Sequence, residues 1–484
     1  MSYLKSIARY ISRRSWWWLL ALPPLALRVA LSLHPEWFWY DESFSVLVAR
    51  LPWAGLWDAT VHDVHPPLYY AVLKIWLWLT GHLVPWVALE VQARSLSLLL
   101  SLIALWLYGK VLDRLDYPNK RLPMLLALYT SGLIYFAAEA RMYALMEVLI
   151  LGAVLALWRP EPQLTLAAVL IAALCWTHNA GLYYAVSIAA ATLLRNRSWG
   201  TLWGIVLVGM GAFVLWIPWI PAMLTQVSNT QQAYWIGTPT LMNAAYVVFR
   251  IVFYARLHPA VWPLVVLLSG GLTIWGSVVT ARERAYVLPL AYGPVILGFL
   301  SSAILGTGAI IPRILAPGLF FAVIVWAELL RREDVGRVLR PVVAVALIVG
   351  FAPFIFPFGK GAANYEFLAA MTQAQPGDIT YAGSTGALPM EIYSPVPFYI
   401  APLANHIGEG LTRETQAALG LRRVWLEDLD SWERCWLIDN ETILTSDEEI
   451  NYMRSLIARY NGELVATMVD GASMEGKLWL LKNE

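Results

Sequence analysis

Residues suited to acid–base chemistry or metal binding gather between Trp39 and Tyr70, directly after one apolar run and directly before another. An acidic pair opens this stretch, and histidines with a further carboxylate close it. These residues are Asp41, Glu42, Asp58, His62, Asp63 and His65. Ionisable groups are costly near a bilayer, so such a cluster at a membrane boundary indicates a functional site.

Asp41 and Glu42 stand where the first apolar run ends. An acidic pair at a helix start could simply stabilise the helix N-terminus, with Asp41 as a plain cap. A carboxylate low in the interface is also partly removed from water. This raises its pKa and makes it a usable general base. We predict that Asp41 is the catalytic base. Neighbours on a helix point about 100° apart, so Glu42 is the second candidate.

The second polar element is His62-Asp63-Val64-His65-Pro66-Pro67. Prolines favour the first turn of a helix, so this element could be a surface loop that starts one. Histidine and aspartate at this spacing could instead contact a phosphate or, with Asp41, bind a metal ion. We predict a catalytic role for His65 and a substrate contact for Tyr69.

Later apolar runs also end in polar residues. Glu139 and Arg141 could form a structural pair, or Glu139 could join Asp41 at a cation while Arg141 faces an anion. His178 could be a hydrogen-bonded core histidine. Arg313 could extend to lipid headgroups or hold a lipid phosphate. The predicted substrate- or phosphate-binding residues are Arg141, Tyr143, Arg313, His178 and Tyr69.

The composition is that of a polytopic membrane protein. Of 484 residues, 59% are hydrophobic and 14% are charged, whereas about 25% are charged in soluble domains. A net charge of +1 gives no reason to expect a nucleic-acid partner. The sequence has no P-loop and no G-x-G-x-x-G, so we predict no nucleotide cofactor. Asp428-x-Asp430 resembles the metal motif of nucleotide-sugar transferases, but no supporting signal accompanies it.

The first apolar run, 16–33, predicts an uncleaved transmembrane helix, and the basic residues before it predict a cytoplasmic N-terminus. The run 66–81 is short for a span and carries Lys74. If it lies in the outer interface, four later basic segments all fall in the cytoplasm. These are 110–121, 195–197, 281–284 and 331–340. We therefore predict an interfacial helix in the first outer loop.

The loop 224–258 is predicted to lie outside. Its second half, which contains Arg250 and Arg256, is predicted to form a second interfacial helix. About eleven transmembrane helices are expected in all. The spans after the first are 91–110, 122–138, 142–158, 163–178, 180–194, 202–223, 259–280, 285–305, 314–330 and 341–357.

The composition changes after Phe358, where charged and apolar residues mix as in soluble domains. Strand-like runs alternate with helical patterns, and Ser446 with Glu449 forms a capping box at the start of a helix. The expected strands are 378–382, 423–426, 435–438, 463–469 and 477–481. We predict two domains, a transmembrane domain over 1–358 and a small extracytoplasmic α/β domain over 359–484.

Four elements in a fixed order make the chain resemble a known family. They are Asp41-Glu42, the block His65-Pro-Pro-Leu-Tyr-Tyr, the block Glu139-Ala-Arg-Met-Tyr, and Arg313 before a proline-interrupted helix. It resembles the bacterial relatives of protein O-mannosyltransferases and of the lipid A aminoarabinose transferase. These are membrane glycosyltransferases with the C-type (GT-C) fold. The likeness extends over about residues 10 to 335.

The resemblance implies a cell-envelope enzyme that transfers a hexose or pentose from a polyprenyl-phosphate carrier to an acceptor hydroxyl of a lipid, glycan or protein. The reaction would occur at the outer face of the plasma or inner membrane, with inversion and with Asp41 as general base. The leaving phosphate needs charge stabilisation, which His65, Arg141 or Arg313 could supply. A divalent cation, Mg²⁺ or Mn²⁺, could be held by Asp41 and Glu139.

A carrier or flippase is the alternative from another class of protein. Such a protein would bind a polyprenyl-linked sugar without chemistry, and the carboxylate–histidine cluster would be a proton or substrate site.

Overall fold

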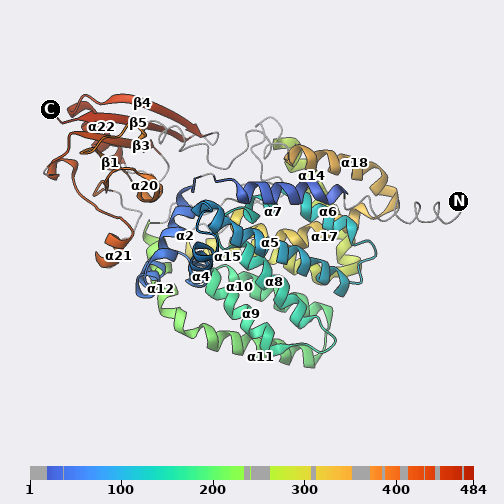
Figure 1. Ribbon diagram of the computed structural model, residues 1–484. Coiled ribbons are helices and arrows are strands. Elements are labelled where there is room, and N and C mark those ends of the chain that lie inside the picture. The colour runs from blue at the N-terminus through green and yellow to red at the C-terminus, as the bar shows by residue number, and fades with distance from the viewer. Residues whose placement is uncertain are drawn as a thin grey trace. The chain divides into compact units, whose positions relative to one another are not determined.

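The computed structural model describes residues 19–35, 37–233, 240, 262–306, 312–351, 371–383, 387–403, 413–429, 431–441, 447–470 and 474–483. These residues are mostly helical, with a five-stranded sheet near the C-terminus (Figure 1). Arg250, Arg256, Asp430 and Ser446 lie outside the described residues, as does the predicted second interfacial helix.

The chain folds as two compact units, each assembled from separate stretches. We call 1–34, 94–219 and 236–358 the membrane unit. We call 35–93, 220–235 and 359–484 the loop unit, because it joins the first long loop to the C-terminal region. One boundary between the units falls between Phe358 and Gly359.

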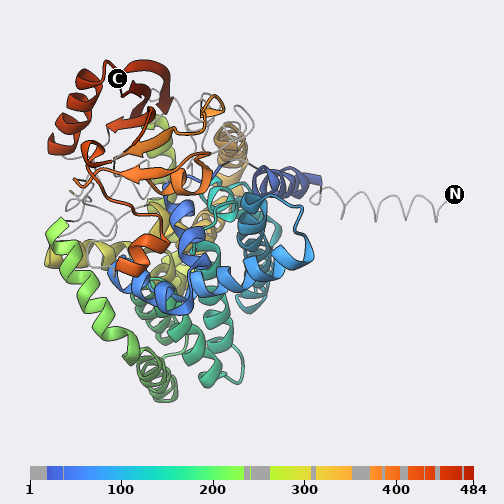
Figure 2. The ribbon, with the colours of Figure 1, turned by 60° about the vertical axis from the view of Figure 1, so that its left-hand side comes forward.

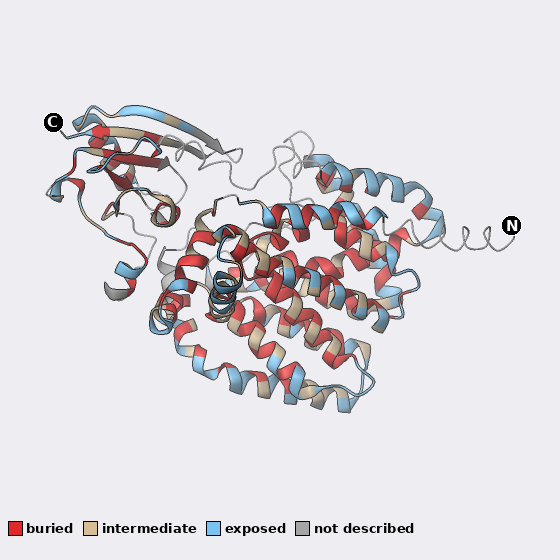
Figure 3. Ribbon diagram, in the orientation of Figure 1, coloured by how far each residue is buried: buried red, intermediate tan, exposed pale blue. Residues whose placement is uncertain are grey.

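Apolar helices make up the membrane unit. They are Leu19–Leu33, α5 (Leu89–Arg114, whose first residues belong to the loop unit), α6 (Arg121–Tyr129), α7 (Ser131–Ala137), α8 (Tyr143–Leu157), α9 (Leu164–Thr177), α10 (Gly181–Arg195), α11 (Trp199–Trp216) with η1 (Ile217–Trp219), α14 (Trp262–Arg284), η4 (Ala285–Val287), α15 (Leu288–Leu305), α16 (Pro312–Leu315), η5 (Ala316–Gly318), α17 (Leu319–Leu330) and α18 (Glu333–Phe351). Nearly every residue of α8 and α17 is buried, whereas α11 and α18 expose apolar side chains (Figure 3).

Within the described residues, four helical stretches are long and apolar enough to cross a membrane, and four shorter apolar helices accompany them. The long stretches are 89–114, 199–227, 263–304 and 313–330. The chain is therefore a multi-pass membrane protein, as its composition predicts, while the number of eleven spans stays a prediction.

The predicted span 122–138 is broken into α6 and α7 at Thr130. Both the backbone N–H and the hydroxyl of Thr130 bond back to the carbonyl of Leu126. A break leaves the last carbonyls of a helix without intrahelical partners. The buried guanidinium of Arg28 donates to two of these carbonyls, Leu128 at 2.9 Å and Ala127 at 3.4 Å. Arg28, a charged residue of the first apolar helix, thus supplies the hydrogen-bond donor for the carbonyls at the end of α6.

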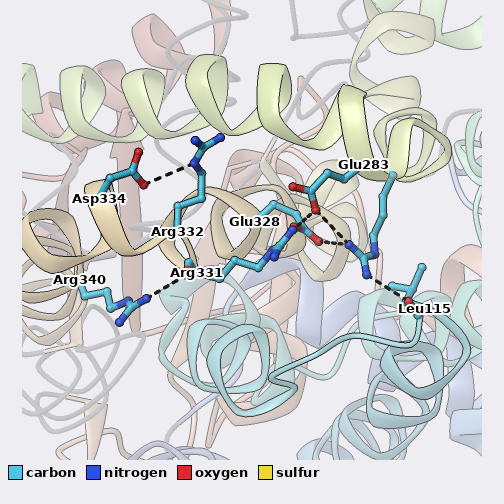
Figure 4. A network of polar contacts seen from close by, with 8 residues as sticks. Leu115, Glu283, Glu328, Arg331, Arg332, Asp334 and Arg340 are labelled. Atoms are coloured by element: carbon cyan, nitrogen blue, oxygen red, sulfur yellow. Dashed lines mark hydrogen bonds and ion pairs between the residues drawn. The ribbon is translucent and has the colours of Figure 1, made fainter.

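An ion-pair network ties three of the basic segments together (Figure 4). Glu328, fully buried near the end of α17, accepts from Arg284 at 2.9 Å and from Arg331 at 2.5 Å. Arg331 also pairs with Glu283, and Arg284 donates to the carbonyl of Leu115 at 3.5 Å.

The fourth basic segment joins the same end through Arg195. Its guanidinium donates to the carbonyl of Arg114 at 2.7 Å and lies over the rings of Trp158 and Tyr286. All four segments therefore lie at one end of the membrane unit, as predicted from the charge pattern.

The loop unit contains α2 (Tyr40–Arg50), α3 (Trp53–His62), α4 (Leu68–Leu83) and α12 (Ile220–Ala233). Helix α4 covers the run predicted as an interfacial helix. Its Lys74 donates to the carbonyls of Leu51 at 2.5 Å and Ala49 at 3.3 Å, at the C-terminal end of α2. A cation at that position complements the helix dipole, so the one charge in an apolar helix holds α2 against α4.

The C-terminal part of the loop unit forms a sheet of strand order β2-β1-β3-β5-β4, parallel among the first three strands and antiparallel among the last three. The strands are β1 (Ile379–Ala382), β2 (Phe398–Ile400), β3 (Arg434–Glu441), β4 (Glu463–Asp470) and β5 (Met474–Lys482), with helices α20 (Ala387–Tyr393), α21 (Arg413–Ala418) and α22 (Asp447–Arg459) and the 3-10 turn η8 (Leu426–Asp428). Helix α22 packs against the sheet through Met453 and Leu456 (Figure 2). The small α/β architecture predicted for this region is confirmed.

Four of the five predicted strands are present. The fifth, 423–426, is only an isolated bridge from Arg423 to Ile400, because the chain turns into η8. Strand β2 was not predicted, since its three residues are too short to show an alternating pattern.

The ion-pair network gives a stability prediction. Glu328→Ala leaves Arg284 and Arg331 without a buried carboxylate, which costs about 3–5 kcal/mol of unfolding free energy. The unfolding midpoint of detergent-purified protein, followed by tryptophan fluorescence, should fall clearly. The matched control is Glu333→Ala, whose side chain is 87% exposed and pairs with the exposed Arg337. Equal midpoints for the two variants would contradict the role of the network.

Candidate active site

The acidic pair lies in the first turn of α2. The N-cap residue is Trp39, which makes no side-chain capping bond, so Asp41 is not the plain helix cap that the sequence left open. Asp41 is half-buried and Glu42 is fully buried. The dipole of α2 favours acidic side chains in its first turn, where Asp41 and Glu42 lie.

His65 and Asp63 form a direct pair. Nδ1 of His65 lies 3.0 Å from Oδ2 of Asp63, and both side chains are largely buried. A carboxylate accepting from Nδ1–H fixes the tautomer and the orientation of the imidazole. His62 makes the corresponding pair with Asp58, at 3.2 Å. Of the two histidines, His65 is the one next to α4, since only Pro66 and Pro67 separate it from the first residue of that helix.

Tyr40 shows which charged groups surround the start of α2. Burial raises the pKa of its hydroxyl, and the nearby carboxylates of Asp41 and Asp63 raise it further, while Arg423 opposes them. Asp41, the Asp63–His65 pair and an arginine from the C-terminal region therefore lie close to one ring. Residues from both polar elements of the first loop therefore lie near Tyr40.

Two more features position this group. Tyr69 and Tyr70 are fully buried at the start of α4, and Tyr70 packs edge-on against Phe44 of α2. Nε2 of Gln226, a buried residue of α12, donates to the carbonyl of Thr60 at 2.7 Å. The same amide lies 3.5 Å from the carbonyl of His65. The substrate contact expected for the buried Tyr69 stays a prediction.

The remaining candidates lie at one end of the membrane unit, opposite the ion-pair network. Glu139 and Arg141 are buried in the turn between α7 and α8. The carbonyl of Glu139 accepts from Ser97 Oγ at 2.5 Å and from the N–H of Arg141 at 2.7 Å. Tyr143 opens α8 with its ring edge-on to Phe136. These bonds fix a tight turn that holds an acid and a base inside the protein.

His178 and Arg313 belong to the same end, because α8, α9 and α10 run antiparallel to one another. Nδ1 of His178 accepts from the N–H of Ala180 at 3.0 Å, which gives this histidine a structural task in the turn before α10. Arg313 lies in α16, and the next carbonyl, that of Ile314, accepts from Tyr184 of α10 at 2.8 Å. The helix break that carries Arg313 is thereby fastened to α10.

The predicted site residues thus form two groups. Asp41, Glu42, His65 and Tyr69 belong to the loop unit, and Glu139, Arg141, Tyr143, His178 and Arg313 belong to the membrane unit. Within the described residues, no three His, Cys, Asp or Glu side chains are placed to hold a metal ion. A metal bound by Asp41 and Glu139 would draw on both units, and it stays a prediction.

Sequence reasoning missed several buried or half-buried polar residues of the two units. The main ones are Arg28, Tyr40, Glu90, Arg94, Glu147, Gln226, Tyr393 and Arg423. Arg28 and Glu147, which interact electrostatically, were detectable as charges inside apolar runs. Tyr393 and Gln226 gave no local signal, since their hydrogen-bond partners are 355 and 166 residues away in the sequence.

The fold is that of the C-type (GT-C) membrane glycosyltransferases, as the sequence predicts, and it is shared with solved structures of one such protein. ArnT from Cupriavidus metallidurans in the apo state matches with a TM-score of 0.59 and 13% identity, over 96% of this chain and 97% of that one. The same protein bound to undecaprenyl phosphate matches with a TM-score of 0.61 and 13% identity, over 96% and 98%. No protein-family model and no curated protein matches the sequence.

Gln226 gives a prediction for the site. Gln226→Ala leaves the buried carbonyl of Thr60 without its donor, which costs about 1–3 kcal/mol. Amide exchange over residues 58–66 should rise in hydrogen–deuterium exchange mass spectrometry. The control is Thr225→Ala, which removes a hydroxyl that bonds only within α12, to Pro221. If both variants exchange like the wild type, Gln226 does not hold this segment.

Proposed function

We propose that the protein is a glycosyltransferase that takes a sugar from a polyprenyl phosphate and transfers it to an acceptor hydroxyl. The observation that carries the proposal is the similarity of the fold, over nearly the whole chain, to a structure with undecaprenyl phosphate bound. Asp41 and the Asp63–His65 pair can act on protons, and Arg141 and Arg313 can bind an anion, so the chain carries both chemical functions that this reaction needs.

The reaction is a single displacement. The acceptor oxygen attacks the anomeric carbon of the sugar, and Asp41 takes the proton from that oxygen as the new bond forms. The bond between the anomeric carbon and the phosphate oxygen breaks at the same time, and the polyprenyl phosphate leaves with the electron pair. Attack from the face opposite the leaving group inverts the anomeric configuration.

The phosphate needs charge stabilisation rather than a proton, because it is already a stable anion. Arg141 and Arg313 can donate charge-assisted hydrogen bonds to it. His65, oriented by Asp63, is the third candidate for the phosphate. A divalent cation held by Asp41 and Glu139 would neutralise further charge, and no step above depends on it.

The orientation follows from the charge pattern. The end of the membrane unit with the Arg284–Glu328–Arg331 network faces the cytoplasm, together with the N-terminus, under the positive-inside rule. The opposite end of the membrane unit then faces the outside, where the donor is a lipid-linked sugar and a nucleotide sugar is absent.

Asp41→Asn tests the catalytic assignment. The amide cannot take a proton, so transfer of tritiated sugar from undecaprenyl-phosphate hexoses and pentoses, assayed in detergent, should fall by about 100-fold or more. Binding of undecaprenyl phosphate should stay within about twofold of the wild type, because the phosphate contacts are elsewhere. Asp58→Asn, a carboxylate of the same loop paired with His62, is the matched control and should keep transfer.

The outcomes separate the two classes of protein. Transfer by wild type that survives in Asp41→Asn would remove Asp41 from catalysis. Binding without transfer by the wild type, with every hexose and pentose donor, would favour a carrier or flippase over an enzyme.

A further inference from the structure

The segment that leads into α2 is held by a residue of the C-terminal region, Tyr393. This tyrosine is the last residue of α20. Its hydroxyl accepts a hydrogen bond of 2.9 Å from the backbone N–H of Phe38. The same hydroxyl donates to Oε1 of Glu90 at 2.8 Å. One side chain thus connects three parts of the loop unit that are far apart in sequence.

The ring of Tyr393 makes a second contact with the same segment. It stacks on Trp37 with centroids 4.3 Å apart and planes at 8°, and it also touches the ring of Phe38. The backbone of Phe38 is only a few residues before Asp41. The carbonyl of Trp39 accepts the first bond of α2, from the N–H of Ser43, so the position of this segment sets the start of the helix.

Glu90 makes the arrangement rigid. It is nearly fully buried in the first turn of α5, and its carboxylate accepts from a hydroxyl that is itself accepting from Phe38. A hydrogen bond to a charged acceptor is stronger than a neutral one, and a chain of such bonds is cooperative. The hydroxyl therefore cannot rotate away without leaving a buried carboxylate with one partner fewer.

We propose that Tyr393 is a positioning residue: it fixes the start of α2 and, through it, the carboxylate of Asp41. Nothing in the proposed mechanism requires the C-terminal region, and this contact gives that region a task. Arg423, from the same region, is near enough to Tyr40 to oppose the rise of the pKa of that hydroxyl. The proposal rests on the proposed function for its kinetic consequence and on the hydrogen bonds alone for its structural one.

The variant Tyr393→Phe keeps the stacked ring and removes both hydrogen bonds. A displaced catalytic group costs up to about 100-fold in rate, so we expect kcat to fall about 10- to 100-fold. The KM for the undecaprenyl-phosphate-linked donor should stay within about twofold, because the variant displaces the proposed base Asp41 and leaves Arg141, Arg313 and His65, the groups proposed for the phosphate, unchanged. Tyr399→Phe, in β2 of the same region, is the control and should leave kcat unchanged.

Glu90, which accepts the hydrogen bond from the Tyr393 hydroxyl, allows a rescue test. Glu90→Ala removes the acceptor for the Tyr393 hydroxyl and should lower kcat as Tyr393→Phe does. Glu90→Gln keeps an oxygen that can accept and should restore most of the rate. A residue that only supports the fold would lower kcat and the unfolding midpoint together and would not separate kcat from KM.

Hydrogen–deuterium exchange gives a readout that does not depend on activity. The amide of Phe38 and those of the first turn of α2 should exchange faster in Tyr393→Phe than in Tyr399→Phe. Unchanged exchange, or a kcat equal to that of the wild type, overturns the proposal. If the wild type transfers no sugar from any donor, the proposed function fails, and the exchange experiment still decides whether Tyr393 holds the segment.

Discussion

Removing charged and backbone polar groups from water costs free energy, and the structure of this protein depends on how those groups find partners. In a membrane every such group needs an internal partner. Arg28 satisfies carbonyls freed by the break at Thr130, and Glu328 neutralises two arginines at the opposite end from the candidate site. The helices can therefore be short and interrupted, and the interruptions bring turns with buried polar side chains into the protein.

The same cost bears on the residues proposed for catalysis. In the membrane unit, Arg141 is buried among apolar helices, where a guanidinium suits the phosphate of a lipid. In the loop unit, the proposed base Asp41 is half-buried and Asp63 pairs with His65. The C-terminal region is joined through Tyr393 to the segment before Asp41.

Much of this could be predicted from the sequence. The membrane class, the helix over 68–83 and the common end of the four basic segments followed from composition and charge, because those signals are local. The GT-C fold was expected from the resemblance of the motifs to a known family. The break at Thr130 could not be predicted, since its carbonyls are satisfied by Arg28, about a hundred residues earlier. Gln226, Tyr393 and Glu90 were missed for the same reason: a single long-range hydrogen bond leaves no periodic pattern.

The most direct test of the account locates the lipid phosphate. Undecaprenyl phosphate carrying a diazirine next to the headgroup, photoactivated with the purified protein and read by mass spectrometry, should label peptides around Arg141, His178 and Arg313. Unmodified undecaprenyl phosphate should suppress that labelling. Competed labelling confined to the opposite end, around Arg284 and Arg331, would contradict both the assignment of the site and the orientation of the chain.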